Sequence, residues 1–168
     1  MNRNRFYLGL ALLGLMAVAT AAITVQRVLV RAVASDGTAQ FRMNLQAMRI
    51  YLDDSGAQLL GRGNFLLTYG TERYNLQLRR LTDMDVTELE GGGYRITLDG
   101  WVNFVPTFFL SRSARPEGGT FHLVIFDLPD GSEEGDTAEF RMVSERGRRL
   151  DFFGEVVDGT LRVSNQSL

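Results

Sequence analysis

The feature that most constrains this chain is the segment at residues 6–25, FYLGLALLGLMAVATAAITV, which carries no charged side chain. A helix rises 1.5 Å per residue, so a segment of this length spans about 30 Å, the thickness of the bilayer hydrocarbon core. A helix also pairs its backbone groups internally, as lipid requires. The segment therefore predicts a membrane anchor. Apolar residues after it extend the expected helix to 6–30, followed by a linker at 31–40.

A cleavable signal peptide is the alternative interpretation. The start is basic, with Arg3 and Arg5, and small-residue sites occur at Ala19-Thr20-Ala21 and Ala32-Val33-Ala34. The apolar run is longer than the 7–15 residues typical of a signal core, which favours a retained anchor. Both interpretations place the rest of the chain outside the cytoplasm.

The orientation of the anchor rests on a near balance of flanking charge. Arg3 and Arg5 precede the segment, and Arg27 and Arg31 follow it. The short leading segment at residues 1–5 carries no domain to translocate, so we expect it to be cytoplasmic. The prediction is a single-pass protein of the inner (cytoplasmic) membrane, with residues 41–168 in the periplasm or outside the cell.

Composition limits the soluble part to one domain and excludes several functions. Roughly 130 residues remain after the anchor and linker, enough for one buried core. Residues 1–40 carry four arginines and one acid (+3), and residues 41–168 carry 14 arginines and 19 acids (−5). An acidic domain repels phosphate backbones, so we expect no nucleic-acid binding. The chain has no cysteine, which excludes disulfides and thiolate metal sites.

After residue 40 the sequence predicts strands and turns. Apolar and polar residues alternate with a period of two, as in Phe41, Met43 and Leu45, and turn residues separate the runs. Asp158-Gly159 is typical of a two-residue hairpin turn. We expect an antiparallel β-sandwich or barrel-like domain of about 8–10 strands. The expected strands are 41–52, 58–69, 73–80, 83–89, 94–99, 101–110, 120–128, 138–144, 150–157 and 161–164.

The catalytic inventory is poor. His122 is the single histidine and lies within an expected strand, where a packed or surface residue is more common than a base. We find no nucleophile elbow, phosphate-binding loop or dinucleotide motif. We therefore predict neither enzymatic activity nor a cofactor.

An acidic loop is a weak candidate for calcium. Calcium prefers several hard oxygen ligands on a flexible loop, but the EF-hand spacing is absent. A solvated acidic turn is the more economical interpretation, with contact to a basic partner surface as a further option. The candidate ligands are Asp127, Asp130, Glu133, Glu134 and Asp136.

Two features suggest contacts with lipid or with a partner. Trp101 to Leu110 is the densest aromatic stretch; its aromatic residues either form the core or are partly exposed to a partner or to headgroups. Small residues in the anchor allow a partner helix to approach closely. The candidate contact residues are Gly9, Gly14, Trp101, Phe104, Phe108 and Phe109.

These observations favour a non-catalytic, membrane-anchored extracytoplasmic subunit, or an accessory or assembly factor, of a larger membrane protein complex of the respiratory, photosynthetic or transport kind. The expected partners are that complex and the lipid bilayer. One alternative is a lipid-carrier or envelope-export component, which predicts an apolar interior cavity. A second is a secreted periplasmic binding domain released by signal-peptide cleavage.

Overall fold

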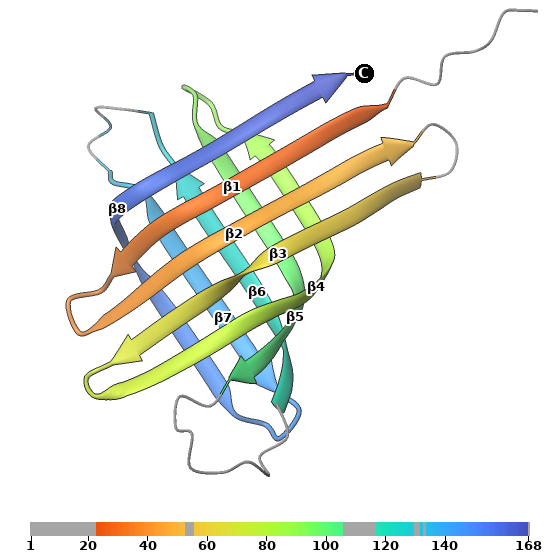
Figure 1. The fold of residues 1–168 in the computed structure, drawn as a ribbon. Helices are drawn as coiled ribbons and strands as arrows, with labels where there is room; N and C mark the ends of the chain where they lie inside the picture. Colours follow the sequence, from red (N-terminus) through yellow and green to blue (C-terminus); the bar gives the residue numbers. More distant parts are fainter. Residues whose placement is uncertain (1–22, 53–55, 106–116, 130–131, 133, 168) are drawn as a thin grey trace, which may run out of the picture.

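A computed structural model describes residues 23–52, 56–105, 117–129, 132 and 134–167. These residues form a closed, antiparallel barrel in which each strand pairs with the next and β8 pairs back with β1 (Figure 1). The strands are β1 (Thr24–Ser35), β2 (Ala39–Leu52), β3 (Gly56–Tyr69), β4 (Glu72–Glu88), β5 (Tyr94–Val105), β6 (Glu117–Asp127), β7 (Thr137–Ser144) and β8 (Arg149–Ser167). The predicted β class and antiparallel barrel are confirmed.

Two strands change partners along their length, which folds the barrel wall into two layers. β4 pairs with β3 through residues 72–77 and with β5 through residues 75–88. β8 pairs with β7 through residues 149–155 and with β1 through residues 155–167. The first layer therefore contains the second half of β8 with β1, β2 and β3. The second contains the part of β4 that pairs with β5, together with β5, β6, β7 and the first half of β8. The strands of the two layers cross at a steep angle in Figure 1.

Aromatic side chains fill the centre of the barrel. The ring centroids of Phe41 and Phe140 lie 4.7 Å apart, and those of Phe65 and Phe140 lie 5.4 Å apart. Phe121 and Phe152 join the same buried cluster. Since alternate residues of a strand point to opposite sides of the sheet, the period-two pattern places these rings inside and polar residues outside.

Residues 24–35 correct the predicted anchor boundary. They form β1, so the helix expected to reach residue 30 and the linker expected at 31–40 are wrong from residue 24 onward. Val28, Val30, Ala32 and Ala34 point into the core, while the residues between them point outward. The physical reason is closure, because β2 and β8 would otherwise each present an unpaired edge. The earlier part of the anchor, residues 6–22, lies outside the described residues.

Several expected strands merge. β4 joins 73–80 to 83–89, and β5 joins 94–99 to the described part of 101–110. β8 runs through Asp158-Gly159, so the hairpin predicted there is wrong. Gly159 instead has a φ of 133° beside a register shift against β1 at Val33/Ala34. This irregularity allows β8 to leave the second layer and continue in the first.

Glycine also sets how closely the two layers approach. Gly61 lies within an unbroken β3. A Cβ at Gly61 would lie 2.6 Å from Leu81 Cδ1 of β4. The missing side chain therefore leaves room for the second layer to pack against β3.

Replacing Gly159 tests the importance of the irregularity in β8. A Cβ there would lie 2.2 Å from the Arg31 carbonyl oxygen, and the φ of 133° is strained for any other residue. We expect Gly159→Ala to lower the free energy of unfolding by about 2 kcal/mol or more, measured by thermal melting in detergent. Gly135→Ala is the control, because nothing lies within 4 Å of its added Cβ. Equal melting temperatures for the two variants would show that the backbone conformation at Gly159 does not stabilise the fold.

The turn between β1 and β2 depends on Asp36. Its Oδ1 accepts hydrogen bonds from the backbone N–H groups of Ala39 and Thr38, at 2.6 and 2.8 Å, and from the Thr38 hydroxyl at 2.8 Å. These bonds favour the charged carboxylate, so they hold the pKa of Asp36 below its usual value of 3.8.

This shift predicts a specific acid sensitivity. A carboxyl group whose pKa is lowered by folding stabilises the fold above its unfolded pKa, and the contribution is lost as the pH falls through the folded pKa. Asp36→Asn should therefore reduce stability at neutral pH and flatten the loss of stability below about pH 4. The measurement is the melting temperature of both chains as a function of pH. Parallel curves for the two chains across this window would contradict the prediction.

Candidate docking surface

In the first layer, most arginine side chains point outward, away from the core. Arg31 of β1 lies opposite Asn44 of β2, Asn44 opposite Asn64 of β3, and Asn64 opposite Gln77 of β4. The neighbouring row runs across β8, β1, β2 and β3 through Arg162, Leu29, Gln46 and Arg62. These side chains point outward because their strand neighbours fill the core.

These rows line a shallow groove on the outside of the barrel, with a volume of about 680 Å³. We call it the polar groove. Its lining is Leu29, Arg31, Asn44, Gln46, Arg62, Gly63, Asn64, Asn75 and Gln77. Arg62 Nε donates a hydrogen bond to Gln46 Oε1 at 3.0 Å, which orients both side chains along the groove wall. The lining contains no carboxylate, so its arginines face outward without a neutralising group in the groove.

The charge of this face contrasts with that of the whole domain. Residues 41–168 have a formal charge of −5. Yet Asp158 is the one acid among the described outward positions of β1, β2, β3 and residues 158–167 of β8. The arginines on this face are Arg27, Arg31, Arg42, Arg62 and Arg162. Guanidinium groups and side-chain amides together recognise carboxylates, phosphates and backbone carbonyls.

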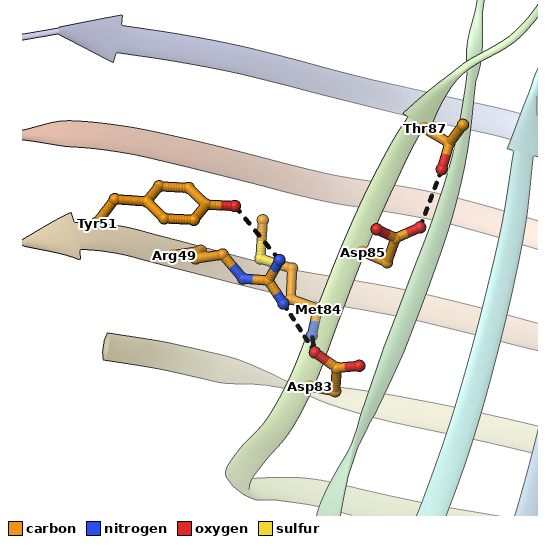
Figure 2. A network of polar contacts seen from close by, with 6 residues as sticks. All are labelled: Arg49, Tyr51, Asp83, Met84, Asp85 and Thr87. Atoms are coloured by element: carbon orange, nitrogen blue, oxygen red, sulfur yellow. Dashed lines mark hydrogen bonds and ion pairs between the residues drawn. The ribbon is translucent and has the colours of Figure 1, made fainter. Parts of the chain in front are cut away.

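A polar bridge joins β2 of the first layer to β4 of the second, beyond the last paired residues of β3 and β4 (Figure 2). Arg49 of β2 donates from Nη2 to Asp83 Oδ1 of β4 at 2.7 Å, and from Nη1 to the Tyr51 hydroxyl at 3.3 Å. Asp83 Oδ1 also accepts the backbone N–H of Met84 at 2.8 Å. The Arg49 side chain is 19% exposed and that of Asp83 is 62% exposed, so the bridge extends from the interior to solvent. We assign it a structural role.

A second link crosses the barrel near the β3–β4 turn. The Tyr69 hydroxyl donates to the backbone carbonyl of Asp151 in β8. Burial raises the pKa of Tyr69, with smaller contributions from the charges of Asp36 and Asp151. Tyr69 therefore stays neutral and able to donate at physiological pH.

The bridge predicts an asymmetry between two neighbouring acids. Asp83→Asn leaves the mostly buried Arg49 without its charged partner and should cost about 1 kcal/mol of unfolding free energy, less at high salt. Asp85→Asn is the matched control, since Asp85 accepts a hydrogen bond from Thr87 on the same strand at 2.9 Å (Figure 2). We expect that control to change stability by less than about 0.5 kcal/mol. Urea unfolding in detergent at two salt concentrations measures the free energy of unfolding of both variants. Equal losses of unfolding free energy would contradict a stabilising role for the Arg49–Asp83 bridge.

The structure places the predicted aromatic contacts differently. Phe104 is 7% exposed and packs edge-on against Tyr74 with ring centroids 5.7 Å apart, so its predicted contact with lipid or a partner is wrong. Its even-numbered position in β5 points inward, along with Val102. Trp101 is half-buried on the outward side, and its contact role stays a prediction. Gly9, Gly14, Phe108 and Phe109 lie outside the described residues.

The acidic loop has a structural use in its described part. Asp136 Oδ1 accepts the backbone N–H of Leu128 at 2.7 Å and so closes the connection between β6 and β7. Among the described residues, no three acidic or histidine side chains are grouped to hold a metal ion. Asp127 and Glu134 are described, whereas Asp130 and Glu133 are not, so calcium binding stays a prediction.

His122 lies on the outward side of the second layer. Its Nδ1 is 2.8 Å from Asp99 Oδ1, directly across the β5–β6 pairing. Both side chains are partly exposed, so this is a cross-strand surface pair. The arrangement agrees with the expected surface role of this histidine.

The polar groove was missed by sequence analysis. Its residues lie at alternate positions of four strands, between Leu29 and Gln77, and each strand alone reads as an ordinary solvated face. The usable signal was the run of arginines and amides at the outward positions of β1, β2 and β3, where the described residues include no acid. Interpreting it required the strand pairing.

Comparison of the chain with protein-family models, with curated proteins and with solved structures found no match in any of the three. In the described part of the chain, no helix has the length and apolar character needed to cross a membrane.

Proposed function

We propose that this protein is a non-catalytic, membrane-anchored extracytoplasmic subunit, or an accessory or assembly factor, of a larger membrane protein complex of the respiratory, photosynthetic or transport kind. The polar groove is the observation that carries the proposal. It offers arginine and amide donors on an outer wall, while the centre of the barrel is occupied by packed rings. Such a surface suits recognition of a partner better than it suits chemistry.

The anchoring part of the proposal rests on the sequence before β1. Residues 6–25 carry no charge, and β1 begins at Thr24. The barrel wall therefore begins within the uncharged segment, whose last two residues, Thr24 and Val25, belong to β1. A tether this short keeps the domain at the membrane surface, where a second contact forms at high effective concentration.

The chemistry of the groove indicates the kind of partner surface. Arg31 and Arg62 each present guanidinium donors with no acid beside them in the lining. Asn44, Asn64 and Gln77 add amide groups along one row. We expect the partner to present carboxylates and backbone carbonyls, for which arginine forms paired hydrogen bonds.

The filled interior argues against the lipid-carrier alternative. That alternative predicts an apolar cavity, whereas Phe41, Phe65 and Phe140 are each fully buried and their rings pack against one another. A bound acyl chain would have to displace these rings, at a cost typical of disrupting a packed core.

The experiment is gentle detergent extraction of the native membrane, size separation and mass spectrometry of the proteins that comigrate. We expect the intact chain in a stoichiometric complex. The double variant Arg31→Gln/Arg62→Gln should reduce recovery of the partner about tenfold, because it removes two charged donors. Arg141→Gln/Arg149→Gln, on the outward side of the second layer, is the matched control and should leave recovery unchanged.

Three outcomes would overturn the proposal. Migration of the intact chain alone would exclude a stable complex. A chain whose N-terminus begins near Ala22 would indicate the secreted binding domain. Stoichiometric lipid recovered with the free chain would indicate the carrier.

A further inference from the structure

The outward side of the first layer ends in an apolar patch at the start of β1. Val25 lies opposite Ile50, and Arg27 lies opposite Met48, which lies opposite Leu60. Leu60 is 53% exposed, more than the other leucines at the outward positions of β1, β2 and β3. A shallow pocket of about 300 Å³ is lined here by Gln46, Met48, Leu60, Gly61 and Arg62. We call Val25, Met48, Ile50 and Leu60 the apolar tip.

Arginines border the apolar tip on the side toward the polar groove. Arg27 lies within the tip, while Arg62 and Arg162 occupy the next row, one outward position further along β3 and β8. Two residues of a strand advance about 7 Å, which resembles the separation between the upper acyl region and the phosphates of a lipid leaflet. In the described rows from Val25 to Arg31, across β8, β1, β2 and β3, no outward position carries a carboxylate.

The tip also occupies the end of the barrel where the uncharged segment joins. The start of β1, the end of β2, the start of β3 and the end of β8 share one end of the first layer (Figure 1). The uncharged residues 6–25 end in β1 at this same end. A chain anchored through them holds this end of the first layer, which includes the tip, closer to the membrane than its opposite end.

We propose that the apolar tip rests on an anionic phospholipid surface, with its side chains at the level of the upper acyl chains and Arg27, Arg62 and Arg162 on the lipid phosphates. The inference rests on the anchoring in the proposed function. Basic residues near a membrane are attracted to anionic lipids, and apolar side chains beside them bury area at the interface. The contact orients the barrel so that the polar groove stands beside the membrane, facing an adjacent membrane protein.

The absence of cysteine from the sequence permits a direct test. Leu60→Cys, labelled with an environment-sensitive fluorophore, is compared with Phe153→Cys, a control position 64% exposed on the outward side of the second layer. The intact chain is reconstituted in nanodiscs of phosphatidylcholine with or without phosphatidylglycerol. Circular dichroism confirms that both labelled chains are folded.

We expect the label at position 60 to be quenched by spin-labelled lipid at least twice as strongly as the label at 153 in anionic nanodiscs. The difference should shrink without phosphatidylglycerol and in Arg27→Gln/Arg162→Gln. Equal quenching at the two positions would overturn the proposal. The proposal would also be overturned if the label at position 60 became shielded from solvent only in the presence of a copurified protein, because the apolar tip would then be a protein interface.

The two proposals fail in different experiments. The nanodisc measurement uses the purified chain, so loss of a comigrating complex leaves the lipid contact standing. Absence of quenching with an intact complex overturns the lipid contact alone. An intact mass that shows cleavage near Ala22 before reconstitution would overturn both.

Discussion

The pairing of β1 with β8 is the constraint on which the rest of the structure depends. It covers residues 24–35 of β1 and 155–167 of β8, and it closes a wall that would otherwise end in two long edges. An open edge presents a row of unpaired backbone groups, and closure removes it. The closure requires β8 to leave the second layer, and Gly159 provides the irregularity through which it does so. One glycine conformation and one strand pairing thus determine that this sheet becomes a barrel.

Closure fixes the division between inside and outside for every strand at once. The inward set is apolar and aromatic, with Phe41, Phe65 and Phe140 at its centre. A ligand could therefore enter the interior only if these rings repacked. Arg49 and Asp83 link β2 to β4 beyond the point where β3 and β4 separate, and Tyr69 links β3 to β8 near the β3–β4 turn.

The outer wall then shows a graded chemistry along the first layer. The apolar tip lies at the end where the uncharged segment joins, and the polar groove, with Arg62 and Arg31 in its lining, follows along the same strands. This order would suit a protein held at a membrane beside a partner protein. The apolar tip would match lipid, and the polar groove would match the polar surface of the partner. The proposed contacts with lipid and with a partner complex share one face but use different rows of it.

The sequence by itself determined the β class and the antiparallel arrangement, because period-two alternation and the intervening turns are local properties. The order of the strands and the closure between β1 and β8 came only from the tertiary structure. The sequence also predicted a packed or surface position for His122, which forms a cross-strand surface pair with Asp99. It did not separate strand from helix at residues 24–35, since a run with Val28, Leu29 and Val30 is apolar enough for either, and only pairing on both sides decides. Likewise Asp158-Gly159 has the same local chemistry in a hairpin and in an irregular strand. The polar groove and the apolar tip depended on tertiary structure, because their residues come from four successive strands and become neighbours only through strand register.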